Sequence, residues 1–244
     1  MTFKAFIFGL LASFGFPWIF AIILPYYSMS SEEVINYGED DSVQGVYQQT
    51  RSGRVSEGSK IYGQEGCTAC HTQLIRPTYA GWDVYRDEWA GLRKTLDNPD
   101  TRRETLSSDY QGEQIAHIGQ SRVGPDLANL GRRLDYHLKG DEMSPRRWVL
   151  EHLYNPRVTQ NYRDGAQDIA ANSSCPSKRG LFKVVDVYGA TGSYLSADVG
   201  EGKGVLPTSR AETLASYLIS LKKDTLGNPL PLALNPNPEA PASE

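Results

Sequence analysis

The sequence is poor in the residues that bind metals or form disulfides, with three cysteines, four histidines and three methionines among 244 residues. It carries a net charge of −4 and has no basic run, which argues against nucleic acid as a partner. We find no internal repeat. No nucleophile, general base or open metal site is evident, so we do not expect this chain alone to carry out chemistry on a substrate.

One pentapeptide uses two of the three cysteines. Residues 67–71 read Cys-Thr-Ala-Cys-His. This C-x-x-C-H pattern is the attachment signature of c-type haem, because two thiols at this spacing can form thioethers with one porphyrin while the adjacent histidine binds the iron. The pattern predicts one covalently attached haem c, held by Cys67 and Cys70, with His71 as its proximal iron ligand.

Two other interpretations use the same residues. A redox-active C-x-x-C pair would need only Cys67 and Cys70. A zinc site would need a further pair of Cys or His residues at ligand spacing. The third cysteine, Cys175, is isolated and far along the chain, so a four-ligand zinc site is poorly supplied. We prefer haem and keep the other two as alternatives.

Only one long hydrophobic run is present. No charged residue occurs from Ala5 to Ser31, and residues 6–27 are almost wholly apolar. This run exceeds the roughly 20 residues needed to cross a bilayer. A cleaved signal peptide usually has a shorter apolar core, and this run ends in Leu24-Pro25-Tyr26-Tyr27, with aromatics where a membrane interface places them. We therefore predict an uncleaved membrane anchor at residues 1–27.

The charges beside this run predict its orientation. Lys4 precedes it, whereas no Lys or Arg follows it until Arg51. By the positive-inside rule, the N-terminus stays in the cytoplasm and everything after residue 27 is exported. Because c-type haem is attached on the outer side of bacterial membranes, the two signals agree. We expect a single-pass protein of the bacterial cytoplasmic (inner) membrane with a periplasmic haem domain.

The rest of the chain divides by composition. We expect a polar, acidic stalk at residues 28–54, a haem domain at 55–223 and a disordered Pro-rich tail at 224–244. The haem domain should be mostly helical. Its expected elements are a helix starting near Val55 with Ser56 as N-cap, a short helical piece at 127–133, a helix from Pro145 to Asn155, a β-like run at 183–188 and an amphipathic helix at 209–223.

Residues around the motif resemble a class I cytochrome c. In that family a glycine and an aromatic residue on the first helix cross the last helix. Gly58 and Tyr62 match the first pair, and Leu214 and Tyr217 match the second. A glycine lets two helices approach closely. The resemblance implies a mainly α fold, in which a class I cytochrome c domain follows one transmembrane helix and carries an enlarged loop at about 78–121.

The same family implies two further cofactor-binding residues. Its Gly-Pro-x-Leu turn supplies a proline carbonyl that accepts a hydrogen bond from the proximal imidazole, and Pro125 occupies this position. Gly131-Arg132 resembles the family's Gly-Arg pair, whose arginine binds a haem propionate. Arg132 is therefore the propionate candidate, with a solvated surface arginine as the alternative.

Three segments, residues 65–77, 121–129 and 152–157, look like subunit II of cbb3-type cytochrome c oxidases. That family has one N-terminal membrane helix and one monohaem cytochrome domain. The resemblance implies that the chain passes single electrons from a soluble or sister cytochrome to the haem-copper catalytic subunit, within a complex that holds a further cytochrome c subunit. The cytochrome subunit of a nitric oxide reductase and a membrane-tethered haem-based gas sensor remain alternatives.

The sixth iron ligand departs from the family pattern. The family places a methionine between the Asn-Pro-Arg helix end and the last helix, but here Cys175 stands at that place, and Met143 precedes the helix. We predict Cys175 as a metal ligand together with His71. The alternatives are an open sixth position or ligation by one of three histidines, His117, His137 or His152. Thiolate or histidine in place of methionine would lower the reduction potential.

Overall fold

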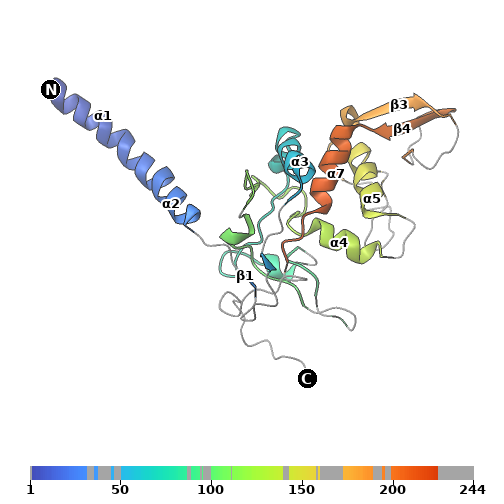
Figure 1. Cartoon of the computed structure of the whole chain (residues 1–244), viewed down its shortest axis with the longest axis horizontal. Coiled ribbons are helices and arrows are strands. Elements are labelled where there is room, and N and C mark those ends of the chain that lie inside the picture. Colours follow the sequence, from blue (N-terminus) through green and yellow to red (C-terminus); the bar gives the residue numbers. More distant parts are fainter. Residues whose placement is uncertain are drawn as a thin grey trace. The chain divides into compact units, whose positions relative to one another are not determined.

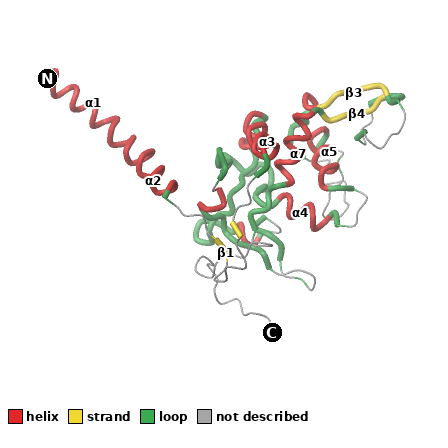
Figure 2. The backbone as a smooth tube through the Cα atoms, in the orientation of Figure 1, coloured by secondary structure: helices red, strands yellow, loops and turns green. Residues whose placement is uncertain are grey.

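The computed structural model describes two compact units, Met1–Tyr47 and Gln48–Glu244. The described residues are 2–31, 36–37, 45–46, 51–86, 89–93, 95, 100–110, 112–139, 143–157, 159, 173–188, 194–195 and 199–224. The predicted disordered tail lies outside them, apart from Asp224, and so does most of the predicted stalk. Helices are the main regular structure of the described residues (Figure 2).

The N-terminal unit holds one long apolar helix, drawn in blue in Figure 1. Its parts are α1 (Phe3–Trp18), a π-helical turn η1 (Ile19–Ile23) and α2 (Leu24–Ser30). Together they span 28 residues, which correspond to about 42 Å. This helix is long and apolar enough to cross a membrane. The same unit contains a two-residue antiparallel pairing of β1 (Asn36–Tyr37) with β2 (Gly45–Val46).

Proline shapes the middle of this helix without ending it. The helix continues through Pro17. Pro25 has no N–H to donate, and just before it the N–H of Leu24 bonds to the carbonyl of Ile19 five residues back. A local π-turn thus accommodates the hydrogen bond that Pro25 cannot donate, as is common in apolar helices.

The second unit is built around two crossing helices, α3 (Gly53–Gln64) and α7 (Ser209–Ile219) (Figure 1). At their closest point, a Cβ added to Gly58 would lie 2.4 Å from the carbonyl oxygen of Thr213 and 2.6 Å from Cβ of Tyr217. The rings of Tyr62 and Tyr217 pack with centroids 5.5 Å apart. The expected glycine–aromatic crossing is confirmed.

Two further helices and one hairpin complete this unit. α4 (Leu130–His137) and α5 (Pro145–Tyr154) both contact α7. β3 (Phe182–Asp186) pairs antiparallel with β4 (Lys203–Pro207). The buried core that these elements share includes Tyr62, Leu134, Leu150, Leu153, Val205, Leu214, Tyr217 and Leu221. The core therefore lies where the four helices meet.

Three predicted boundaries were wrong. α3 begins at Gly53 and its N-cap is Ser52, whose hydroxyl accepts from the N–H of Val55, so Ser56 lies inside the helix. The short helix begins at Leu130, three residues later than predicted. α7 ends at Ile219 because the chain beyond it bonds elsewhere: the N–H of Gly131 donates to Leu221, and that of Lys223 donates to Ala128.

The enlarged loop packs against the segment that follows the C-x-x-C-H motif. It contains two short 3-10 turns, η3 (Asp83–Tyr85) and η4 (Ser107–Tyr110). The N–H of Ile75 donates to the hydroxyl of Thr105, and the N–H of Gln73 donates to the carbonyl of Ile118. The loop thus supports the chain on the C-terminal side of His71.

Candidate haem site

The C-x-x-C-H motif follows directly on α3. Gly66, with a φ of 73°, lets the chain leave the helix in a left-handed conformation, and η2 (Cys67–Ala69) comes next. The N–H of His71 bonds back to the carbonyl of Cys67 at 3.0 Å. Both motif cysteines are free thiols, and burial raises the pKa of Cys67 to about 11. The motif therefore presents two free thiols and one imidazole on a compact turn.

The ring of His71 is oriented by residues 124 and 125. Its Nδ1 lies 2.8 Å from the carbonyl oxygen of Pro125, which can only accept, so Nδ1 carries the proton. A Cβ added to Gly124 would lie 2.2 Å from Cε1 of the ring. Burial lowers the pKa of His71, which keeps the ring neutral. Nε2 thus has the free electron pair that a metal ligand needs.

Asp126 holds the Pro125 turn to the motif. Its carboxylate accepts from the hydroxyl of Thr72 at 2.6 Å and from the N–H groups of Leu74 and Ala128 at 2.8 and 2.7 Å. Burial raises the pKa of Asp126, and these three bonds oppose that effect. Arg122 adds bonds to Thr72 and to the carbonyl of Leu74. His71 and its acceptor are therefore fixed relative to each other.

The two adjacent arginines on α4 have different partners. Arg132 bonds through Nε to both carboxylate oxygens of Asp224, at 3.1 and 3.0 Å, and is not a solvated surface arginine. Arg133 is 2% exposed and donates from Nη2 to the carbonyl of Asp126 at 2.8 Å. Its buried Nε has no hydrogen-bond partner in the described part of the chain.

Arg133 lies close enough to His71 that its charge lowers the pKa of the imidazole. The sequence reasoning missed this residue. The available signal was its spacing, since Arg133 follows Leu130 by three positions and therefore shares its buried helix face. A buried guanidinium with an unpartnered N–H near the imidazole of His71 is suited to bind an anionic group there.

Cys175 lies near the two motif cysteines. It raises the pKa of Cys67, and Cys70 in turn raises that of Cys175, whose largest cause of elevation is burial. Within the described part of the chain, its Sγ makes a weak contact with the carbonyl of Pro176, at 3.9 Å. No group of three or more His, Cys, Asp or Glu side chains in the described ranges could hold a metal ion. The zinc alternative gains no support from these residues.

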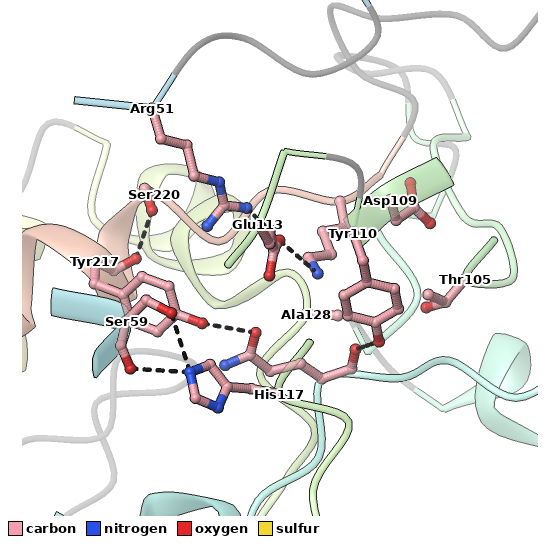
Figure 3. Close-up of polar contacts among 12 residues, drawn as sticks. Arg51, Ser59, Thr105, Asp109, Tyr110, Glu113, His117, Ala128, Tyr217 and Ser220 are labelled. Carbon is pink, nitrogen blue, oxygen red and sulfur yellow. Dashed lines mark hydrogen bonds and ion pairs between the residues drawn. The ribbon is translucent and has the colours of Figure 1, made fainter. Parts of the chain in front are cut away.

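The other three histidines are in different environments. Nε2 of His117 lies 2.9 Å from the carbonyl oxygen and 3.0 Å from the hydroxyl of Ser59, as Figure 3 shows. His137 packs on Tyr136 at the end of α4. His152, on α5, stacks on Trp148 with ring centroids 4.9 Å apart and planes at 14°.

A polar network that the sequence did not reveal joins the enlarged loop to the end of α7 (Figure 3). Glu113 pairs with Arg51 at 2.6 Å and with Lys223 at 3.0 Å. The ammonium of Lys223 lies 3.7 Å from the centroid of the Tyr110 ring. The hydroxyl of Tyr217 donates to the side chain of Gln73 at 3.1 Å. These contacts couple the loop, the motif segment and the last helix.

Neither a protein-family model nor a curated protein matches this chain. The case for a cofactor therefore rests on the site itself. The residues fit a c-type haem in three respects: two free thiols at attachment spacing, an imidazole with an available Nε2, and a buried arginine with an unpartnered N–H.

Proposed function

We propose that this chain is a membrane-anchored c-type cytochrome that passes single electrons to the haem-copper catalytic subunit of a cbb3-type respiratory oxidase. The observation that carries the proposal is the C-x-x-C-H motif at 67–71, in which the hydrogen bond from His71 to Pro125 leaves Nε2 available. When bound, haem c supplies a one-electron Fe(III)/Fe(II) couple.

The residues of the site have separate tasks in this proposal. Cys67 and Cys70 hold the cofactor covalently, and His71 binds the iron through Nε2. Pro125 orients the imidazole and strengthens it as a donor. For the propionate contact we propose Arg133 in place of Arg132, because Arg132 already binds the buried carboxylate of Asp224.

The fold supports a class I cytochrome c domain. The close crossing of α3 and α7 at Gly58 is the contact that the resemblance implies, and α4 and α5 also pack on α7. The loop at 78–121 braces the segment after the motif. We propose that these elements enclose the cofactor and keep water from it.

We propose that the helix Phe3–Ser30 anchors the domain in the bacterial inner membrane, with Lys4 on the cytoplasmic side and the haem domain in the periplasm. The expected partners are the catalytic subunit, a further cytochrome c subunit and a donor cytochrome. Reporter fusions at the two termini test the topology. A cytoplasmic signal from a C-terminal fusion would refute it.

Covalent haem is the first experimental test. The full chain, expressed with a c-type haem maturation system, should stain for haem after denaturing electrophoresis. Cys67→Ala and Cys70→Ala together should abolish the stain, whereas the matched control Cys175→Ala should retain it. An unstained wild-type chain would refute the proposal and favour the thiol-disulfide alternative.

Affinity purification from native membranes tests the complex. Co-purification of a multi-span subunit with oxygen reductase activity supports the proposal, whereas one with nitric oxide reductase activity would favour that complex instead. Rapid carbon monoxide binding by the isolated ferrous protein would favour the gas sensor, because a sensor needs a labile or open sixth position.

A further inference from the structure

One ion pair in the polar network of Figure 3 is held away from solvent. The ammonium of Lys223 lies 3.0 Å from Oε1 of Glu113, and the two side chains are only 4% and 3% exposed. They come from distant parts of the chain, since Glu113 belongs to the enlarged loop and Lys223 follows α7. Taking two charges out of water costs free energy unless their remaining protons and lone pairs find partners. Further polar contacts are therefore needed to complete this pair.

Both partners of this pair keep an unpartnered atom. Oε1 of Glu113 also accepts from Arg51 at 2.6 Å, but Oε2 is buried and accepts no hydrogen bond within the described part of the chain. Nζ of Lys223 lies over the Tyr110 ring, 3.7 Å from its centroid, and forms no hydrogen bond to a described residue. Its contact with Oε1 is thus an ion pair without hydrogen-bond geometry.

The charges around the ammonium of Lys223 do not replace the water that it loses on burial. Burial lowers its pKa, and the charge of Glu113 opposes this effect without cancelling it. Because Arg51 shares Oε1 with Lys223, one carboxylate serves two cations. Asp109, whose charge also raises the pKa of Lys223, is itself paired with Arg103. A further polar group beside Nζ would stabilise the charged form.

The two unpartnered atoms require opposite properties of a ligand. Nζ of Lys223 can only donate, and Oε2 of Glu113 can only accept. A cation would be repelled by the first side chain and an anion by the second, whereas a water molecule accepts and donates at once. Oε1 and Oε2 are joined through one carbon, and Nζ lies 3.0 Å from Oε1. A single water can therefore reach both unpartnered atoms.

We propose that Glu113 and Lys223 bind one internal water molecule, which donates to Oε2 of the first and accepts from Nζ of the second. Internal waters in proteins bind to buried polar groups of this kind, which otherwise lack partners. Arg51, at the edge of the pair, is 21% exposed, so the site lies near enough to the surface for a water to enter. Since none of these contacts involves the C-x-x-C-H motif, the water site is independent of the proposed function.

The water completes a junction of three segments of the chain. Arg51 precedes α3, Glu113 belongs to the enlarged loop and Lys223 follows α7. Beside this junction, Tyr110 donates its hydroxyl to the carbonyl of Gln73, in the segment after the motif. The water thus helps to hold the enlarged loop on that segment.

A crystal structure of the full-length wild-type chain, purified in detergent and solved at a resolution that shows single waters, tests the site directly. We expect a water within hydrogen-bond distance of both Oε2 of Glu113 and Nζ of Lys223. A direct bond between these two atoms, a protein group bonded to Oε2, an ion in place of the water, or no density at this position would each overturn the proposal.

Nuclear magnetic resonance of the full chain with isotope-labelled lysine gives the second test, in solution. A buried ammonium exchanges its protons slowly, so Lys223 should give a resolved signal with a nuclear Overhauser contact to bound water. Lys223→Met should abolish this signal, whereas the control Lys60→Met, at an exposed ion pair, should keep it. If Lys223→Met does not fold, Lys223→Arg identifies the signal, because it removes the ammonium but keeps a cation for Glu113. Absence of the signal, or a signal without contact to water, would refute the water site.

Discussion

The imidazole of His71 donates from Nδ1 to the carbonyl oxygen of Pro125 at 2.8 Å, across 54 positions of sequence. Gly124 lies against the same ring so closely that a Cβ there would be 2.2 Å from Cε1. The turn at 124–125 therefore controls both the tautomer and the position of the ring. Asp126 in turn ties this turn to Thr72.

Gly124→Ala should displace the His71 ring, because the added methyl group and the ring cannot occupy the same space. We expect a destabilisation of about 1–3 kcal/mol, typical of an overpacked site, and a partly high-spin haem. Denaturant titration and the ferric spectrum measure the two effects. Gly180→Ala is the control, since no atom lies within 4 Å of its added Cβ. Equal behaviour of the two variants would contradict the geometry.

Gly58→Ala should destabilise the fold where α3 crosses α7, because the new Cβ would lie 2.4 Å from the backbone oxygen of Thr213. The overpacking cost exceeds the helix-propensity gain of about 1 kcal/mol, so we expect a net loss of about 2 kcal/mol. Gly53→Ala, at the open start of the same helix, should be neutral or slightly stabilising. Urea denaturation of both variants is the measurement, and a stable Gly58→Ala protein would refute the close crossing.

Arg132→Gln and Arg133→Gln should have different effects. Arg132→Gln removes the cation that bonds to the buried carboxylate of Asp224, so we expect a loss of stability of about 3–5 kcal/mol. Arg133→Gln removes the positive charge next to His71, which should lower the reduction potential because the ferric state then has less repulsion. Denaturation and potentiometric titration separate the two. If the reduction potential changed more in Arg132→Gln than in Arg133→Gln, Arg132 would be the residue that binds the propionate.

The ionised carboxylate of Asp83 should stabilise the folded protein, and this stabilisation should be lost in acid. Burial alone would raise the pKa of its carboxyl, but bonds from Arg76 and Arg122 outweigh burial and hold the pKa at about 2. Since this value lies below the ordinary pKa of 3.8, the stabilisation is complete above about pH 4 and is lost as the pH falls toward 2.

Asp83→Asn should therefore cost about 2 kcal/mol at neutral pH and flatten the dependence of unfolding free energy on pH between about 4 and 2. The matched control is Glu57→Gln, which removes an exposed pair with Lys60 and should change stability by less than about 0.5 kcal/mol. Denaturation at a series of pH values is the measurement. An unchanged acid slope in Asp83→Asn would show that the carboxylate is not held by the two arginines.

Local patterns predicted the parts of the fold that depend on neighbouring residues. The apolar run after Lys4 forms one helix, Phe3–Ser30, and Pro145 begins α5 as its fixed φ favours. The β-like run at 183–188 contains most of β3. The glycine crossing was expected from the family resemblance, and the structure contains it: a Cβ on Gly58 would clash with the backbone of Thr213.

Other features depend on contacts between residues that are distant in sequence. The amphipathic pattern at 209–223 could not mark the end of α7, because residues beyond Ile219 leave the helix to bond Gly131 and Ala128. The roles of Arg132 and Arg133 could not be separated in sequence, since only the fold brings Asp224 to the first and His71 to the second.

The sequence by itself determined the two thiols, the imidazole and the apolar helix, because each depends on residue type and on spacing within a few positions. Only the tertiary structure decided which groups surround that imidazole. Pro125 and Arg133 act on His71 from outside the motif, and Cys175 comes to lie near Cys67. Long-range packing brings these side chains together, and no local pattern along the chain encodes it.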